Sequence, residues 1–437
     1  MPMIKRTFVV LFIILVLLAY GGVFCYHTSP DVTDFVLRYN EVQCLRSGVD
    51  PFDVWSGKVH SDRFVPLTKK ELATPFAPHP QDREHMVHAY SPWAYSFFYP
   101  FTWFSLKTAH GLYFIMLFTA LTLSAFGLFF LTKPLNGQRC GNEVRLFISC
   151  LTLLAVLWIF YRDLVYEGYS ILLVAGLVGM ILSLQHEDAN KDAKTVVNRW
   201  QLAAGFSWAL AMLKPQVGLL FLVPLAVGKK WCAIITAGTL CLLASVPPAI
   251  WCGKSIISLC LQVPKIGAPY VSGNGLLPAW CKASVLLKAP AAPLVCLAVG
   301  VGLCVLASIR LRRNTDWLIK MIPAIVLVRV WTTYMNPRDS LIYCIPLVFC
   351  FRELFCSESQ TWKRKMGLLS VIGLFCLTLE WGFWLFILPK NIGLISEKTS
   401  AMFAYRVLSM GDVAYWCLLG VFCFWVWLKG RKKNVAL

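Results

Sequence analysis

Long apolar runs separated by short polar segments make up nearly the whole chain. A helix needs about 20 consecutive apolar residues to cross the hydrocarbon core of a bilayer, and by that measure we predict about twelve membrane spans. The fifth and sixth runs are short and are separated by Lys214-Pro215, so they are either two half-helices or one broken helix. The predicted spans are residues 8–25, 109–131, 145–162, 168–185, 201–213, 216–228, 231–251, 291–309, 317–335, 340–355, 366–388 and 409–428.

The polar segments between these runs alternate in charge. Cations follow every second span, beginning with Lys5 and Arg6 before the first one. Cationic loops stay in the cytoplasm, so the pattern predicts cytoplasmic N- and C-termini in a multi-pass protein of the plasma (inner) membrane. We interpret the first span as an uncleaved signal anchor, since no A-x-A site follows it. Residues 26–108 are then an extracytoplasmic loop.

The composition of the chain agrees with a multi-pass membrane protein. Of the 437 residues, 58% are hydrophobic and 14% are charged, whereas soluble domains carry about a quarter charged residues. The net charge of +19 would suggest nucleic-acid binding in a soluble protein. Here its distribution makes it an orientation signal, so we expect membrane lipids and no nucleic acid as partners. The predicted fold is an all-α polytopic transmembrane bundle, a single integral membrane domain over residues 1–437, with an outer interfacial helix after the first span.

The 17 cysteines show no C-x-x-C and no metal-ligand spacing. Most lie inside predicted spans, where cysteine behaves as a small hydrophobic residue. Cys44 and Cys281 lie in predicted outer loops and either pair in a disulfide or remain free, because sequence does not give their separation. We expect no metal site and no cofactor.

Ionisable residues near the membrane are costly and often functional, and the densest group follows the first span. Read as a helix, this segment places Phe35, Tyr39 and Val42 on one face, with Asp34, Arg38 and Glu41 on the other. Gly48 ends the helix, and Asp50-Pro51-Phe52 turns the chain. A carboxylate at this position can accept a proton from a hydroxyl nucleophile. The alternative roles of Asp34 are an i,i+4 ion pair with Arg38 or a charge at the end of the helix.

Two further groups lie at predicted outer boundaries. The segment from His88 to Pro100, which includes Tyr90, is rich in aromatic residues and is either an interface belt or a surface for stacking on sugars. Arg162 and Asp163 are typical of a local pair. Glu167 stands just inside an apolar span, where a carboxylate is harder to explain structurally.

The break at Lys214-Pro215-Gln216 forms another candidate. Proline frees backbone groups that must be satisfied by protein or water. Lys214 either holds a lipid-linked phosphate or extends to the interface as a snorkelling side chain. Arg338 in the Asn336–Asp339 segment either grips phosphate or pairs with Asp339. Lys254 is expected to be a solvated loop charge.

In order and placement, these groups resemble glycosyltransferase family 87, whose typical members use polyprenol-phosphate-mannose. The family pattern begins with an acidic residue after the first span, matched by Asp34-Phe35, and continues with G-x-N-P-Y, matched by Gly48–Phe52. Its Y-x-P element matches Tyr90–Pro92, and its span ending in Lys-Pro matches Ala203–Pro215. The chain departs from the family at Gly168-Tyr169-Ser170, where Gly-Gln-x-Asn is usual. It departs again at Pro337-Arg338-Asp339, where Trp-x-His is common.

The resemblance implies a GT-C fold with its active site at the outer membrane surface. It implies a polyprenyl-phosphate sugar donor, a lipid or glycan acceptor, and Asp34 as the general base of an inverting transfer of mannose or another sugar. Cations such as Lys214 and Arg338 would stabilise the leaving phosphate. The candidates for substrate binding are Arg38, Tyr39, Tyr90, Glu167, Lys214, Gln216, Arg338 and Asp339.

Two other classes remain as alternatives. A lipid or sugar transporter or flippase would show broken helices near the midplane and often internal repeats. We find no repeat, and the acids gather at the outer interface. A polysaccharide polymerase or ligase usually carries its large outer loop late in the chain, whereas the longest polar loop here comes early. The sequence therefore favours a transferase.

Overall fold

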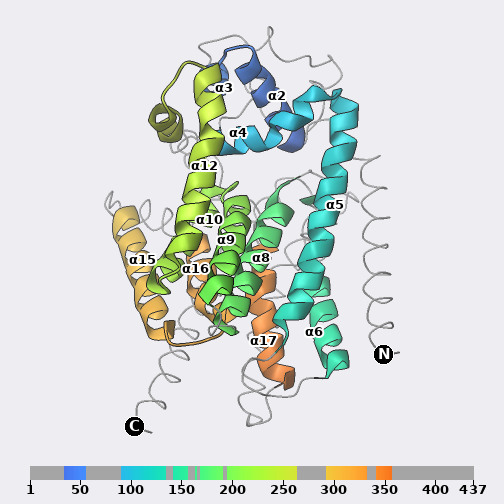
Figure 1. The fold of residues 1–437 in the computed structure, drawn as a ribbon, viewed down its shortest axis with the longest axis vertical. Helices are drawn as coiled ribbons and strands as arrows, with labels where there is room; N and C mark the ends of the chain where they lie inside the picture. The colour runs from blue at the N-terminus through green and yellow to red at the C-terminus, as the bar shows by residue number, and fades with distance from the viewer. Residues whose placement is uncertain are drawn as a thin grey trace, which may run out of the picture.

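The computed structural model describes residues 34–55, 90–133, 141–155, 163–164, 168–189, 194–262, 292–331 and 341–356. This part of the chain is helical and contains no strand, which confirms the all-α prediction (Figure 1). Three of its helices are long and apolar enough to cross a membrane: α5 (Leu106–Leu131), α8 (Ser170–Ala189) and α12 (Trp231–Trp251). The predicted spans 8–25, 366–388 and 409–428 lie outside the described residues, so the count of about twelve stays a prediction.

The other helices either belong to the bundle or lie across one of its ends. They are α2 (Asp34–Arg46), α3 (Pro51–Trp55), α4 (Pro92–Phe98), η3 (Tyr99–Trp103), α6 (Asn142–Ala155), α9 (Lys194–Ala211), α10 (Pro215–Gly218), η4 (Leu219–Phe221), α11 (Leu222–Val227), α15 (Ala292–Leu311), α16 (Trp317–Trp331) and α17 (Cys344–Cys356).

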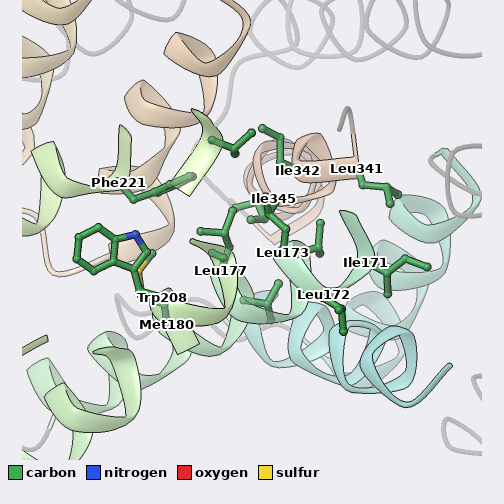
Figure 2. Packing of buried hydrophobic residues seen from close by; sticks show 14 of the residues in the cluster. Ile171, Leu172, Leu173, Leu177, Met180, Trp208, Phe221, Leu341, Ile342 and Ile345 are labelled. Carbon is green, nitrogen blue, oxygen red and sulfur yellow. The ribbon is translucent and has the colours of Figure 1, made fainter. Parts of the chain in front are cut away.

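Helix α8 is the centre of the packed core. In its most apolar window 72% of the residues are buried inside the protein, against 22% for α12. Apolar side chains of α8 meet Trp208 of α9, Phe221 of η4 and Ile345 of α17 (Figure 2). The backbones of α8 and α9 come very close at Gly176, where a Cβ atom would lie 2.5 Å from the Ser207 carbonyl oxygen. Small residues at helix crossings are the usual basis of such packing in membranes.

Helix α12 lies at the periphery of the described part. It packs on α9, where a Cβ atom at Gly205 would lie 2.6 Å from the Thr236 side chain. Its other face carries exposed apolar side chains, among them Ile235, Leu243 and Ile250. A continuous apolar surface of this kind is stable against lipid and unfavourable in water. The face therefore identifies α12 as a lipid-exposed helix of a membrane protein.

The fifth and sixth apolar runs are two separate segments that run in opposite directions. Lys214, between α9 and α10, bonds to Ser170 at the start of α8. Lys230, between α11 and α12, bonds to Asp188 near the end of α8. Ser170 and Asp188 are separated by about 27 Å along α8. The Lys214-Pro215 break is therefore the turn of a helical hairpin rather than a kink in one span.

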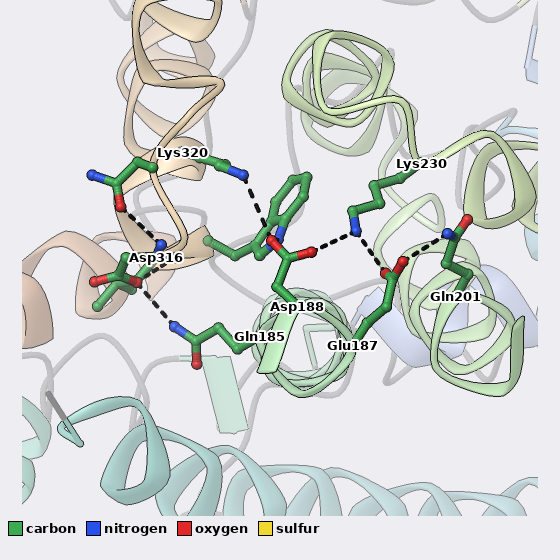
Figure 3. A network of polar contacts seen from close by, with 10 residues as sticks. Gln185, Glu187, Asp188, Gln201, Lys230, Asp316 and Lys320 are labelled. Carbon is green, nitrogen blue, oxygen red and sulfur yellow. Dashed lines mark hydrogen bonds and ion pairs between the residues drawn. The ribbon is translucent and has the colours of Figure 1, made fainter. Parts of the chain in front are cut away.

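A buried network of charged residues closes the bundle at the C-terminal end of α8 (Figure 3). Lys230 lies 2.8 Å from Glu187 and 2.9 Å from Asp188. Asp188 also lies 3.8 Å from Lys320, while the Trp317 indole donates to it at 2.9 Å. Lys230 belongs to the cationic pattern that predicts topology, yet it is only 7% exposed and holds helices together.

The same network extends to α17 and α5. Asp316, at the start of α16, is bonded by Arg352 and, at 3.0 Å, by Gln185. Arg352 also donates to the carbonyl oxygen of Leu131, the last residue of α5. Three acids and three bases thus meet in one buried region, so their charges balance. They are Glu187, Asp188, Asp316, Lys230, Lys320 and Arg352, whose side chains are each at most 9% exposed.

At the opposite end of α8, the helices α2, α3 and α4 lie across the bundle, at the top of Figure 1. The predicted apolar face of α2 is confirmed, since Phe35, Tyr39 and Val42 are buried in the core. Helix α2 ends where predicted. Gly48 has a φ of +76°, a left-handed conformation that favours glycine. Its backbone N–H donates to the carbonyl of Leu45 at 2.9 Å.

Candidate active site

The second face of α2 carries buried charges. Arg38 is 5% exposed and Glu41 is fully buried, and their side chains form an ion pair of 2.7 Å. Desolvation alone would lower the pKa of Arg38, but Glu41 and three nearby tyrosines raise it, so the guanidinium is held firmly in its charged form. The ion pair that the structure shows for Arg38 is therefore with the residue three positions later. The charged guanidinium is thus held in place on α2 as one half of a buried ion pair.

Tyr90 connects this charge to the rest of the bundle. The Arg38 guanidinium lies over the Tyr90 ring, 4.4 Å from its centroid. The ring meets that of Tyr169 edge to face, with centroids 5.5 Å apart. Such contacts hold aromatic rings in a definite orientation. Tyr90 thus faces the protein interior at this end of α8.

The start of α8 supplies the next part of the site. The buried carboxylate of Asp163 accepts a hydrogen bond of 2.9 Å from the Ile171 backbone N–H, in the first turn of the helix. Arg162 lies outside the described residues, so the predicted local pair with Asp163 stays a prediction. A carboxylate at this position stabilises a helix start. The cap fixes Tyr169 and Ser170, the two residues where the helix begins.

Lys214 enters the same region from the turn between α9 and α10. It is 5% exposed, so the snorkelling interpretation is wrong. Its ammonium donates to the Ser170 hydroxyl at 2.9 Å and lies 4.6 Å from the centre of the Tyr169 ring. The Trp93 indole donates to the carbonyl oxygen of Met212 at 2.7 Å, so a side chain of α4 satisfies part of the broken backbone.

Asp34 completes the group. It is half-buried in the first turn of α2, one helical turn before Arg38 on the same helix. We call Asp34, Arg38, Tyr90, Tyr169 and Lys214 the site cluster. Two cations, Arg38 and Lys214, lie over two tyrosine rings that contact each other. The Asp34 carboxylate lies one turn of α2 from the first of these cations. This arrangement can accept a proton at one point and hold a negative charge at another.

The structure places the other predicted residues as follows. Tyr39 packs in the core, and its hydroxyl donates to the Phe104 carbonyl at 2.9 Å, so its contacts are those of a structural residue. Gln216 is half-buried in α10, two positions after Lys214. Glu167, Arg338 and Asp339 lie outside the described residues.

The structure describes one of the two cysteines that were considered for a disulfide. Cys44 has a free thiol, and Cys281 lies outside the described residues. Burial, with a smaller contribution from Glu41, raises the pKa of the Cys44 thiol to about 12. A thiol with such a pKa is unreactive at neutral pH.

The Asp50-Pro51-Phe52 turn has a structural partner that the sequence does not reveal. Asp50 is 4% exposed and accepts hydrogen bonds from Lys254 at 2.5 Å and from Gln262 at 2.8 Å. Lys254 also bonds to Asp53 at 2.7 Å. Desolvation would lower the pKa of Lys254, but the two carboxylates raise it. The prediction of a solvated Lys254 is wrong, because this lysine joins the α2–α3 segment to the residues after α12.

We expect Lys254→Ala to lower the free energy of unfolding by about 1–3 kcal/mol, because it leaves the buried Asp50 carboxylate without its cation. Thermal unfolding of the purified protein in detergent measures the effect. Asp50→Asn added to Lys254→Ala should recover part of the loss. Lys107→Ala, which removes an exposed lysine of α5, is the control. A Lys254 variant as stable as this control would contradict the anchoring role.

Sequence reasoning passed over two residues of this region. Tyr169 stood only as a departure from a family pattern, and Glu41 only as a member of a polar helix face. The detectable signal for Glu41 was its spacing of three from Arg38, which suits an ion pair on a helix. An aromatic residue at the start of a span is common at membrane interfaces, so nothing distinguished Tyr169.

Comparison with known proteins agrees with the resemblance. The sequence profile of glycosyltransferase family 87 matches residues 88–332, more than half of the chain. The matched region includes Tyr90, Tyr169 and Lys214 and begins after α2, so it does not include Asp34. No curated protein and no solved structure matches the chain. The chain belongs to glycosyltransferase family 87 and is a membrane glycosyltransferase.

Proposed function

We propose that the protein transfers a sugar from a polyprenyl-phosphate donor to a hydroxyl group of a lipid or glycan acceptor on the extracytoplasmic face of the membrane. The observation that carries the proposal is the site cluster. Asp34 lies one turn of α2 before Arg38, which covers the Tyr90 ring, and Lys214 lies over the adjoining Tyr169 ring. The chemistry of such a transfer needs a base and a phosphate-holding cation in one site.

In this mechanism Asp34 accepts the proton of the acceptor hydroxyl as its oxygen attacks the anomeric carbon. A new C–O bond forms while the bond to the donor phosphate oxygen breaks, and the configuration at the carbon inverts. The products are the glycosylated acceptor and polyprenyl phosphate. The phosphate monoester is already a good leaving group, so the step does not require a metal ion.

Lys214 and Arg38 have separate tasks. Lys214, held by Ser170 and the Tyr169 ring, stabilises the charge that develops on the leaving phosphate. Arg38 is fixed by Glu41 and faces Tyr90, where it can orient the acceptor beside Asp34. Arg338 and Asp339 remain candidates for substrate binding, as does Glu167. The lipid part of the donor would lie along apolar helix surfaces in the bilayer.

The proposal predicts that purified protein in lipid nanodiscs consumes a synthetic polyprenyl-phosphate sugar and releases polyprenyl phosphate when membrane lipid extract is present as acceptor. Mannose, glucose and arabinose donors should be compared, with product analysis by mass spectrometry and with NMR to establish the inverted linkage. Nucleotide sugars serve as the contrasting donors. Transfer directly from a nucleotide sugar would contradict the proposal, and so would retention of configuration.

A further inference from the structure

Two tryptophan side chains hold the turn that carries Lys214, one on each side of the lysine. Pro215 has no backbone N–H, so α9 cannot continue its ladder of hydrogen bonds through this point. The carbonyl of the buried Met212, two residues before Lys214, instead accepts the Trp93 indole N–H at 2.7 Å. A backbone carbonyl in a protein interior is costly to leave without a donor, so this hydrogen bond stabilises the turn in its observed shape.

The other side of the turn is held by Trp208. Its indole donates to the carbonyl of Gly218, four residues after Lys214, at 2.8 Å. A Cβ atom at Gly218 would lie 2.9 Å from the Ala211 carbonyl oxygen, so α10 folds back tightly against the end of α9. The Lys214 carbonyl accepts the Val217 and Gly218 backbone N–H groups at 2.9 and 2.8 Å. The turn is therefore compact, and its shape sets the direction in which the lysine side chain leaves the backbone.

Trp93 differs from the other indole because it comes from outside the hairpin. It lies in the first turn of α4, 119 residues before Met212 in the chain. Tyr90 stands three residues earlier, and the Arg38 guanidinium lies over its ring at 4.4 Å. The start of α4 thus contacts Arg38 through one aromatic side chain and the Lys214 turn through another. The position of α4 therefore relates the two cations of the site cluster.

We propose that Trp93 is a positioning residue of the sugar transfer, whose indole N–H holds the Lys214 turn in a fixed place relative to α4. This inference rests on the proposed function, in which Lys214 meets the donor phosphate. It adds that the place of this lysine is set by a contact between helices and not by the hairpin alone. A residue that acts only in packing would change the stability of the protein without changing its use of the donor.

Trp93→Phe removes the indole N–H and keeps an aromatic ring on α4. The kcat/KM for the donor should fall about tenfold, the factor expected for one lost hydrogen bond to a buried carbonyl, while the KM for the acceptor stays unchanged. Inhibition by polyprenyl phosphate should weaken by about the same factor. A benzothiophene analogue of tryptophan at this position keeps the shape of the indole and lacks its N–H, so it should have the same effects without leaving a cavity.

Hydrogen exchange, followed by mass spectrometry in nanodiscs, supplies a readout that needs no substrate. Trp93→Phe should speed the exchange of the Val217 and Gly218 amides about tenfold, because the turn opens more often. The matched control is Trp317→Phe, which removes an indole hydrogen bond of 2.9 Å at the opposite end of α8. It should leave these amides and the use of the donor unchanged. Gel filtration of each variant identifies misfolded protein.

The outcomes separate this inference from the function on which it rests. Unchanged exchange at Val217 and Gly218 in both variants of Trp93 would show that the indole does not hold the turn, whatever the activity. Faster exchange with a donor kcat/KM and inhibition like those of the wild-type protein would overturn the positioning role while the function stands. If the wild-type protein uses none of the polyprenyl-phosphate donors, the proposed function fails, and the role of Trp93 in sugar transfer fails with it.

Discussion

Asp34→Asn is expected to lower kcat for sugar transfer by about 10²–10⁴-fold, the usual loss on removing a general base. The asparagine amide has nearly the same shape as the carboxylate but cannot accept the acceptor proton at neutral pH. The KM for the donor should change little, because Lys214 and its contacts with Ser170 and Tyr169 remain. Initial rates with a polyprenyl-phosphate sugar in nanodiscs measure both constants.

The protein fold should tolerate this change. Asp34 is half-buried in the first turn of α2, where loss of a negative charge costs about 0.3–1 kcal/mol. Glu143→Gln, which neutralises an exposed acid in the first turn of α6, is the matched control and should remain fully active. Formate added to Asp34→Ala should restore part of the rate by replacing the base. Undiminished transfer by Asp34→Asn would show that Asp34 is not the general base, and Glu167 would be the next candidate.

The sequence predicts helices best where the signal is local. The long apolar runs that become α5 and α8 are matched within a few residues, because roughly 20 apolar residues in lipid have few alternatives to a helix. Spacing of three and four residues predicts the two faces of α2, and Gly48 predicts its end. Each of these inferences uses neighbours within two turns of the same helix.

The site cluster depends on contacts between distant parts of the chain, and pattern alone identifies only its members. Lys214 and Ser170 are 44 residues apart, yet they share a hydrogen bond. Lys254 lies 204 residues from Asp50, so no local pattern reveals its partner. A lone lysine beside a glycine is therefore interpreted from sequence as part of a surface loop. The hairpin at Lys214-Pro215 likewise follows from where its two ends lie along α8.

The charge network shows a different limit. Lys320 and Arg352 lie inside predicted spans, and the cost of a charge in an apolar run is a signal that could have marked them. Their partners, however, come from helices whose order in the bundle the sequence does not specify. Three acids and three bases at one end of α8 therefore became visible as a balanced group only in the folded chain.

Asp188→Asn is expected to lower the free energy of unfolding by about 3–5 kcal/mol, the usual cost of removing one partner from a buried ion pair. Asp188 lies 2.9 Å from Lys230 and 3.8 Å from Lys320, and its side chain is 9% exposed. Without its charge, three buried cations of the network face only two acids. Equilibrium unfolding by SDS in mixed micelles measures the loss, with Glu143→Gln as the exposed control.

A double-mutant cycle shows whether the loss arises from the ion pair. Asp188→Asn with Lys230→Gln removes one charge of each sign, so the network is again balanced. The double variant should be destabilised by at least about 1 kcal/mol less than the sum of the two single variants. Additive losses would show that the pair is not coupled. Lys230 follows α11 and Asp188 lies on α8, so this pair joins the hairpin to α8. The pair lies about 27 Å along α8 from Ser170. Coupling between the two residues would therefore mean that the network helps to hold the Lys214 hairpin in place.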